Sequence, residues 1–434
     1  MRVAVVGAGI VGVATAQALA DDGHELAVFE RHGSVGTEAS FANAGFLAPG
    51  YVAPWAAPGM PRKLAAQFFE RDAAVRLGAW PTLRALRWGL RWRRACAADV
   101  HAANRAALLA LAHDSLARTR ALARRLALDY DRAPGVLVLL RSEREVALAR
   151  SGLKAMAESG LAFHLVDGAA ARRIEPALNE ATALKAAIHL PDAEVGNCRH
   201  FAQGLKHQLA ERGVALHFNH EVLRIEPDGA GVRLTVAERA ADVESTLPAP
   251  PDAPRREQRF DAVVVCAANG APPLLAPLRI ALPLLPVYGY SITLPVRHFE
   301  AHPDVGPRAG LMDERFKVAV SRIGDRVRVA GSAEIGGPPE RMNEKALATL
   351  YRVLDDWFPS AARQAHAQTW KGARPMLPDG PPAIGATRVP GVWLNTGHGS
   401  SGWALACGSA ALLADLIGAR APAVDPARFA PTRW

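Results

Sequence analysis

Residues 3–12 read Val-Ala-Val-Val-Gly-Ala-Gly-Ile-Val-Gly, and this stretch decides the fold. The first four residues form a short apolar run that is typical of a buried strand, and an alanine-rich helix is expected over 11–20. Residues 25–30 read Glu-Leu-Ala-Val-Phe-Glu, which indicates a second strand. The chain is therefore predicted to open with a βαβ unit of the Rossmann type, in an α/β protein.

Three glycines, Gly7, Gly9 and Gly12, fit the G-x-G-x-x-G pattern of dinucleotide-binding folds. The first allows a tight turn, the second lets the backbone approach a pyrophosphate, and the third packs the helix closely on the strand. Glu30 ends the second strand about 20 residues further on, where a carboxylate accepts hydrogen bonds from ribose hydroxyls and repels a 2′-phosphate. NADP is disfavoured, while FAD and NAD remain. A glycine turn that binds no nucleotide is the structural alternative.

Composition narrows the remaining classes of function. The chain has 434 residues, of which 50% are apolar, and this is enough for two domains with large cores and no disulfides. Four cysteines, Cys96, Cys198, Cys266 and Cys407, lie far apart without a C-x-x-C pair, so neither a zinc site nor a redox dithiol is expected. The formal net charge of +9 comes from arginines scattered along the chain, so no nucleic-acid partner is expected either.

Two features bear on where the protein acts. Met1-Arg2 passes directly into a strand, and arginines interrupt the long Ala/Leu stretches, so we expect neither a signal peptide nor a membrane span but a cytoplasmic protein. The stretch from Trp80 to Arg94 holds three tryptophans, five arginines and no acid, which suits a peripheral contact on the inner face of an anionic membrane. Its tryptophans do not share one stripe at helical spacing, so a core helix of a substrate domain is the alternative.

The rest of the chain predicts two interleaved domains. Helices are expected over 63–130, 142–159, 199–212, 343–357 and 403–418, and residues 239–259 read as a solvated extension. Residues 284–294 and 316–331 alternate apolar and polar side chains, as antiparallel strands with one covered face do. We predict a discontinuous nucleotide-binding domain over 1–62, 191–280 and 365–434, and an α+β substrate domain with a mixed or antiparallel sheet over 63–190 and 281–364.

Two further glycine-rich segments could approach a cofactor. Residues 40–45 read Ser-Phe-Ala-Asn-Ala-Gly and offer small side chains, a hydroxyl and an amide just after the second strand. Residues 395–403 read Asn-Thr-Gly-His-Gly-Ser-Ser-Gly-Trp, which indicates a turn into a helix whose N-terminus suits a developing negative charge. The string Gly-Ala-Arg-Pro at 372–375 precedes it.

These strings resemble the FAD-dependent D-amino-acid oxidase superfamily, and the chain from Met1 to about Leu416 resembles its respiratory branch, the bacterial D-amino-acid dehydrogenases. Gly289-Tyr290-Ser291 and the strings at 312–317, 326–331 and 333–335 also carry the resemblance. It implies FAD as cofactor, a two-domain fold, and oxidation of an amino acid to an imino acid that hydrolyses to a 2-oxo acid and ammonia. Electrons would pass on to a quinone or another acceptor. In this family the arginine of the Arg-Pro pair, here Arg374, holds the substrate carboxylate.

The resemblance also implies a set of site residues. Tyr290 either lines the pocket or packs in the core, Phe316 stands where some relatives carry a tyrosine, and His398 could act as a base or donate only from its backbone. Gly372 stands where the sarcosine-oxidase branch has a cysteine linked to flavin, so FAD is expected to bind non-covalently. The expected cofactor contacts are Gly7, Gly9, Ile10, Val11, Gly12, Glu30, Arg31, Ser40, Asn43, Ala44, Gly45, Val222, Gly372, Gly397, His398, Gly399, Ser400, Ser401, Gly402 and Trp403.

Two other functions stay open. One is an oxygen-using amine or secondary-amine oxidase of the same superfamily, of the glycine or sarcosine type. The other is a non-catalytic flavin-binding subunit, which would keep the glycine fingerprint without needing Arg374. The sequence indicates no oligomeric state.

Overall fold

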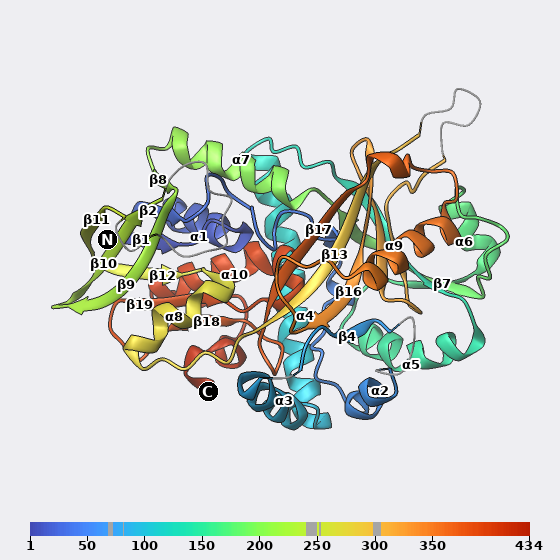
Figure 1. The fold of residues 1–434 in the computed structure, drawn as a ribbon, viewed down its shortest axis with the longest axis horizontal. Coiled ribbons are helices and arrows are strands. Elements are labelled where there is room, and N and C mark those ends of the chain that lie inside the picture. The colour runs from blue at the N-terminus through green and yellow to red at the C-terminus, as the bar shows by residue number, and fades with distance from the viewer. Residues whose placement is uncertain (68–72, 81, 240–249, 251–252, 298–304) are drawn as a thin grey trace.

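Two large β-sheets organise the chain, and each combines strands that lie far apart in the sequence (Figure 1). The computed structural model describes residues 1–67, 73–80, 82–239, 250, 253–297 and 305–434. Figure 1 shows a six-stranded sheet on the left of the view, beside the N-terminus, and a ten-stranded sheet on the right. This mixed α/β architecture agrees with the fold class predicted from the sequence.

The six-stranded sheet contains the βαβ unit that residues 3–30 predict. Its strands run in the order β18-β19-β12-β1-β2-β8, and only β18 is antiparallel to its neighbour. Both faces of such a sheet need an apolar cover, and here α1, α7 and α10 supply one of them. The elements are β1 (Arg2–Val6), α1 (Ile10–Asp21), β2 (Glu25–Glu30), α7 (Cys198–Glu211), β8 (Ala215–Phe218), β12 (Ala262–Val265), β18 (Ala383–Ala386), β19 (Val392–Thr396) and α10 (Gly402–Ile417).

A small antiparallel sheet covers the other face. Its apolar residues, such as Val232 and Leu234, pack with Phe29 and Val265 of the central strands. The elements are β9 (His220–Asp228), β10 (Gly231–Glu238), β11 (Arg255–Phe260) and the short helix α8 (Ala271–Leu275). The solvated extension expected over 239–259 lies mostly outside the described residues.

The ten-stranded sheet is mixed, as the sequence predicts for the second domain. Its main path is β17-β13-β16-β15-β14-β5-β7-β3, with β4 joined to β16 and β6 joined to β7. The β14–β5 and β16–β4 pairs are parallel and the other pairs are antiparallel. The strands are β3 (Phe46–Leu47), β4 (Val75–Leu77), β5 (Ala133–Leu140), β6 (His164–Asp167), β7 (Ala186–Val195), β13 (Leu285–Pro295), β14 (Gly310–Asp313), β15 (Val318–Ile323), β16 (Arg326–Ile335) and β17 (Gln368–Met376).

Helices flank this sheet on both faces. α9 places Leu350, Val353 and Trp357 against one face, where none of the three is more than 1% exposed. α5 packs on the opposite face, beside Val138 and Ile188. The α-helices not yet given are α2 (Met60–Gln67), α3 (Leu83–Ala95), α4 (Ala98–Arg125), α5 (Glu143–Glu158), α6 (Gly168–Ile174) and α9 (Glu344–Trp357).

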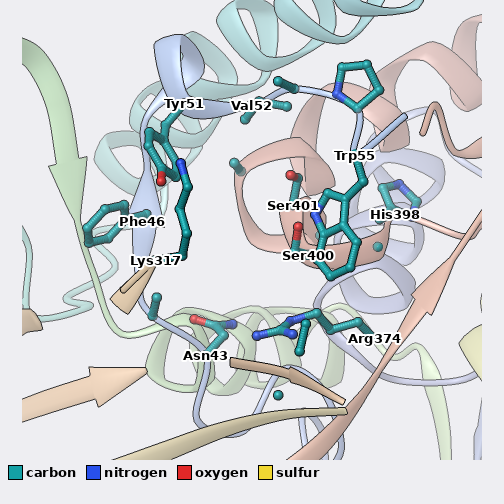
Figure 2. A pocket seen from close by; sticks show the side chains of 18 of the residues that line it. Asn43, Phe46, Tyr51, Val52, Trp55, Lys317, Arg374, His398, Ser400 and Ser401 are labelled. Carbon is teal, nitrogen blue, oxygen red and sulfur yellow. The ribbon is translucent and has the colours of Figure 1, made fainter. Parts of the chain in front are cut away.

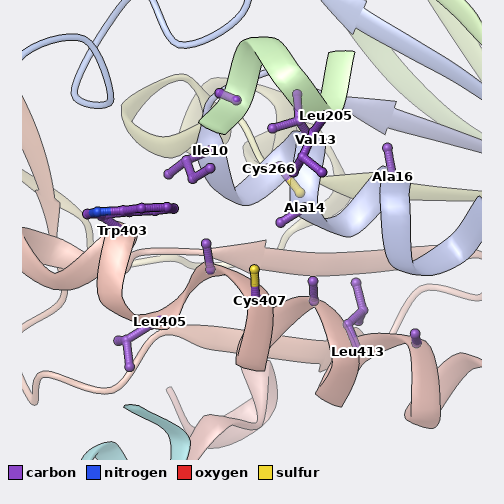
Figure 3. Packing of buried hydrophobic residues seen from close by; sticks show 14 of the residues in the cluster. Ile10, Val13, Ala14, Ala16, Leu205, Cys266, Trp403, Leu405, Cys407 and Leu413 are labelled. Atoms are coloured by element: carbon purple, nitrogen blue, oxygen red, sulfur yellow. The ribbon is translucent and has the colours of Figure 1, made fainter. Parts of the chain in front are cut away.

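α10 is the helix on which the core around the six-stranded sheet is built (Figure 3). It packs against α1 and α4, and Cys407 and Leu413 face Val13 and Ala14 in one apolar cluster. Among the described residues, Gly399–Ile417 alone is long and apolar enough to cross a membrane, although the sequence suggested no such span. Because 61% of this stretch is buried inside the fold, it occupies the place of a core helix.

The structure differs from the sequence prediction in two places. Residues 63–130 do not form helices alone, because β4 interrupts them and pairs with β16 through Val75 and Ala333. β3 and β17 join the ten-stranded sheet, although the predicted boundaries assign both to the nucleotide-binding domain. The division of the chain into two domains remains a prediction.

Candidate active site

A cavity of about 960 Å³ lies where the two sheets meet. The N-terminal ends of α1 and α10 and the loop from Ala39 to Ala57 line one part of it. Strands β5, β7, β13, β16 and β17 line another part, and α2, α3 and α5 border the remainder. Figure 2 shows the side chains that face this space from these different elements.

The fingerprint glycines leave the first turn of α1 open. Gly9 caps the helix without any side-chain hydrogen bond, and a Cβ atom there would meet only Ser40 Oγ, at 3.5 Å. Ile10 N–H donates to Ser40 Oγ at 3.1 Å. A Cβ on Gly12 would lie 2.9 Å from the carbonyl carbon of Gly7, so close packing requires a glycine at that position. The free N–H groups of this helix end form an anion site of the kind that binds pyrophosphate.

Glu30 lies behind the fingerprint turn and outside the lining of the cavity. Its carboxylate accepts hydrogen bonds from Ala8 N–H at 2.7 Å and from His32 N–H at 3.0 Å. Burial raises the pKa of Glu30, although these two bonds oppose the shift. Arg31 pairs with Glu38, and Val222 packs under the six-stranded sheet, so these two expected cofactor contacts do not line the cavity.

The second expected helix N-terminus is also present. Gly397 and Gly399 have φ values of +83° and +56°, which residues with a Cβ atom rarely adopt, and they turn the chain into α10. This helix end has no side-chain cap. Thr396 Oγ1 and Trp403 Nε1 are buried and have no hydrogen-bond partner in the described part of the chain. The arrangement leaves polar groups for a ligand that carries hydrogen-bonding atoms on a flat ring.

Arg374 projects from β17 into the cavity, on the side of Asn43 (Figure 2). Its Nη1 donates to the carbonyl of Ser332 at 2.8 Å. Within the described residues, no carboxylate oxygen lies within 4.0 Å of its guanidinium. Burial lowers the pKa of Arg374 to about 10, so the group is still cationic at neutral pH. A half-buried cation without an opposite charge beside it can bind an anionic group of a ligand.

Tyr290 both lines the cavity and belongs to the core of the ten-stranded sheet. Its hydroxyl donates to Glu334 Oε2 at 2.9 Å, and Asn343 Nδ2 donates to the same oxygen at 2.7 Å. Lys371 Nζ donates to the other oxygen, Glu334 Oε1, at 3.3 Å. Burial is the larger cause that raises the pKa of Tyr290, and the carboxylate of Glu334 is the second. The side chain therefore stays a neutral phenol.

His398 is a buried, neutral residue. Burial lowers its pKa to about 3, so the imidazole carries no charge at any pH at which the protein would work. Nε2 lies 3.0 Å from Ser409 Oγ, whose hydroxyl donates to Ala406 O. Because that hydroxyl proton is already used, Nε2 is the donor in the His398–Ser409 bond. This bond fixes the ring beside the first turn of α10, and the low pKa makes the imidazole a weak base.

Phe316 does not reach the cavity. The sequence suggested a strand that begins at 316, but residues 314–317 form a turn, in which Phe316 N–H donates to Asp313 Oδ1 at 3.1 Å. The turn directs the Phe316 ring into the core, where Arg141 lies 5.1 Å from the ring centre. Lys317, with φ of +54°, lines the cavity instead.

The structure brings most of the other expected residues together. Gly9, Ile10, Val11, Ser40, Asn43, Ala44, Gly45, Tyr290, Gly372, Arg374 and the whole stretch 397–403 line the cavity. Sequence reasoning missed Ser332, which lines the cavity and holds Arg374. It lies between two strings that carry the family resemblance, and its φ of +57° has no signature in the sequence.

Comparison with known proteins agrees with this geometry. The family model of the FAD-dependent oxidoreductases called DAO matches residues 2–416. The chain belongs to this family. The D-amino acid dehydrogenases of Chromohalobacter salexigens and Rhizorhabdus wittichii are 38% and 37% identical to it, each over the full length of both chains. Glycine oxidase from Geobacillus kaustophilus has the same fold, with a TM-score of 0.74, 22% identity, and coverage of 100% of this chain and 99% of its own.

The residues present fit FAD. The open end of α1 can hold the pyrophosphate, and Glu30 lies at the strand end where the adenosine ribose is bound in dinucleotide folds. The turn into α10 offers the second helix end, with the unpartnered Thr396 and Trp403 beside it. The protein is an FAD-dependent oxidoreductase, and its own residues can supply both contact regions.

Proposed function

We propose that this oxidoreductase removes hydride from the α-carbon of D-amino acids and yields imino acids, which hydrolyse to 2-oxo acids and ammonia. The Arg374 cation, which has no carboxylate beside it in the described residues, is the observation that supports this substrate class most directly, because it matches a carboxylate. The full-length identity of 35–38% to proteins named D-amino acid dehydrogenases supports the choice of the D series.

Arg374 performs the main binding step. Its planar guanidinium has free N–H groups that can grip both oxygens of a carboxylate, and this grip determines which hydrogen of the α-carbon faces the cofactor. The apolar lining, which includes Trp55 and the ring of Tyr290, excludes water from the bound amine. When FAD is bound, it supplies the hydride acceptor. His398 stays neutral and introduces no competing charge.

Replacing Arg374 tests the substrate class. We expect Arg374→Ala to lower kcat/KM for D-amino acids by roughly 30- to 5000-fold, because the substrate carboxylate would be buried without a partner. Arg374→Lys should recover only part of the loss, since an ammonium group lacks the planar fork. Anaerobic reduction of the flavin by paired D- and L-amino acids gives the stereochemistry. The proposal is wrong if Arg374→Ala slows a carboxylate-free amine as much as it slows the amino acid.

We infer that FAD is held without a covalent bond. Gly372 lies where related flavin-linked enzymes have a cysteine, and a Cβ atom there would lie 2.7 Å from Cζ3 of Trp370. The Trp370 ring fills the space that a longer side chain would need. Acid or heat should therefore release FAD, and flavin that stays with the denatured chain would contradict the inference.

The electron acceptor separates this proposal from its rival. We propose that a quinone accepts the electrons, in line with the dehydrogenase names of the full-length relatives. An oxidase that uses oxygen directly is the alternative, and the fold shared with a glycine oxidase is compatible with it. Steady-state turnover with oxygen, compared with turnover with a soluble quinone, decides between the two.

We also propose that α3 contacts an anionic membrane. Its outward face carries Leu83, Leu86 and Leu90, which follow helical spacing and are 74%, 52% and 61% exposed. Trp80, just before the helix, is 94% exposed. Exposed apolar side chains of this size gathered in one stripe are a mark of an interaction surface.

The charges beside this stripe support an anionic membrane as the partner. Arg87, Arg91, Arg93 and Arg94 are exposed on the same helix, and in the described part of the chain none has a carboxylate within 4.0 Å. α3 contains no acidic residue. A leucine stripe bordered by unpaired arginines matches apolar lipid chains below anionic headgroups. The opposite face of α3 lines the cavity, so an acceptor dissolved in lipid would meet the protein close to its site.

A further inference from the structure

A β-bulge lies beside Arg374. β13 and β16 are paired in antiparallel register except at one point, where Ser332 and Ala333 of β16 together oppose Gly289 of β13. Such a bulge turns one peptide unit out of the regular hydrogen-bond ladder. Here the residue that leaves the ladder is Ser332.

Ser332 adopts a left-handed conformation, with φ of +57°, inside a buried strand. Residues with a Cβ atom rarely adopt it, and those that do are concentrated at functional sites. The consequence is that the carbonyl of Ser332 accepts a bond from Arg374 Nη1 at 2.8 Å. One N–H of the guanidinium is thereby fixed, and the remaining donors are free for a ligand.

Gly289 provides the space for the guanidinium. Arg374 is paired with Val287 across β13 and β17, so its side chain lies on the same face as residue 289, two positions along. A Cβ atom on Gly289 would lie 2.5 Å from Cζ of Arg374 and 3.0 Å from Nη1. The φ of Gly289 is not in the left-handed region, so the backbone itself does not require a glycine there. The requirement is set by Arg374 alone.

We propose that Gly289 and the bulge at Ser332 together position Arg374 for a carboxylate. Gly289 lets the side chain lie flat across the strand, and Ser332 fixes its rotation from one end. Both are positioning residues, which act through Arg374 without touching the ligand's reacting atoms. The proposal rests on the proposed role of Arg374 in binding the substrate carboxylate.

Gly289→Ala is the first test. The three atoms nearest to its Cβ belong to the end of a flexible side chain, so the protein should fold with normal FAD content while Arg374 is displaced. We expect KM for a D-amino acid to rise about 10- to 100-fold, with kcat within about threefold, because the bidentate grip is lost and the chemistry is not. Turnover of the matching carboxylate-free amine should not change. Acetate affinity, measured by calorimetry without turnover, should fall by the same factor as the rise in KM.

Gly306→Ala is the matched control, because a Cβ atom at Gly306 would make only ordinary contacts, at 3.6 Å or more, and lies away from the cavity. In an Arg374→Ala background, Gly289→Ala should have no further effect on acetate affinity, since the two residues act as one unit. Ser332→Val is a second variant, which places no new Cβ atom against Arg374. A β-branched residue adopts the left-handed conformation less readily than serine does, so the carbonyl should turn away from Arg374 and acetate binding should weaken about three- to tenfold.

Unchanged acetate affinity in folded Gly289→Ala or in folded Ser332→Val overturns the positioning proposal. If Arg374→Ala binds acetate as well as the unmodified protein does, the proposed function fails instead. If the carboxylate-free amine is slowed as much as the amino acid, Gly289 shapes the cavity in general, and the proposal is again wrong.

Discussion

Arg374 and Glu175 are, at the scale of single residues, two ionisable groups that the fold keeps largely away from water. A buried ion without an opposite charge destabilises the fold, so its retention points to a ligand or to local strain. Arg374 faces a cavity large enough for a ligand. Glu175 is 3% exposed, lies outside that cavity, and has one carboxylate oxygen without a hydrogen-bond partner in the described structure.

Glu175 gives a prediction about pH. Burial raises its pKa to about 7 from the usual 4.5, although Arg308 N–H, at 2.7 Å, opposes the shift. The native state therefore holds a proton between pH 4.5 and 7 that the unfolded state has released, and the stability contributed by this group falls as pH rises through that window. Compared with Glu175→Gln, the unmodified protein should lose on the order of 2–3 kcal/mol between pH 5 and 8. Urea unfolding at several pH values measures this difference, and parallel curves for the two proteins would exclude the effect.

Glu30 gives a second prediction at this scale. Its carboxylate lies next to the fingerprint turn and away from the cavity, so it should affect the affinity for FAD and not the reaction. We expect Glu30→Ala to weaken FAD binding by about 1–3 kcal/mol, with near-normal turnover once FAD is in excess. Titration of the apoprotein with FAD measures the affinity. A turnover defect that persists at saturating FAD would remove Glu30 from the cofactor role.

α3 shows at the scale of an element how one helix can serve two environments. Trp88 and Trp92, one turn apart, stack with their ring centres 6.5 Å apart, and Trp88 Nε1 donates to Met376 O at 3.0 Å. Both rings face inward, while Leu83, Leu86 and Leu90 face out. The two interpretations of the sequence, a core helix and a membrane contact, describe opposite faces of this helix. The packing of Trp88 and Trp92 shows that the inner face belongs to the core. The membrane contact of the outer face is a prediction.

Vesicle sedimentation tests that prediction. The protein should bind phosphatidylglycerol vesicles more tightly than phosphatidylcholine vesicles, and Arg87→Glu combined with Arg91→Glu and Arg94→Glu should weaken binding by at least on the order of 100-fold. Replacing the three outward leucines with serine should also release the protein, at unchanged activity with a soluble acceptor.

Two exposed sites elsewhere serve as controls for the vesicle measurement. Arg144→Glu combined with Arg150→Glu changes the charge of α5, and Leu165→Ser removes a leucine that is 48% exposed on β6. Neither variant should affect vesicle binding. Equal binding to charged and neutral vesicles, or loss of binding in the control variants, would rule out a specific contact through α3.

At the scale of the whole molecule, patterns within short stretches of sequence predicted the structure that depends on neighbouring residues. The glycine turn and the period of the apolar residues were enough to predict the βαβ unit and the alternating strands of the second sheet, and most of the site residues that the family resemblance implied do line the cavity. Contacts between distant segments were not predictable in this way. β4 forms because Val75 meets Ala333, and no residue near β4 indicates this partner. The Phe316 ring turns inward because Asp313, three residues earlier, caps a turn that the alternating pattern of 316–331 does not reveal. The left-handed backbone conformation of Ser332 was likewise not predictable from the sequence.

The order of the central strands has a consequence for how the protein is made. β1 lies between β2 and β12, and β12 in turn pairs with β19, so residues near 4, 263 and 393 are neighbours in one parallel sheet. The ribosome synthesises β1 long before it reaches β19. The apolar strands made early therefore stay without their last neighbouring strand during most of synthesis. Sheets with such long-range pairing form slowly and pass through aggregation-prone intermediates. Production of this protein should therefore depend on chaperones and on low temperature, and neither its N-terminal nor its C-terminal half should fold when expressed alone.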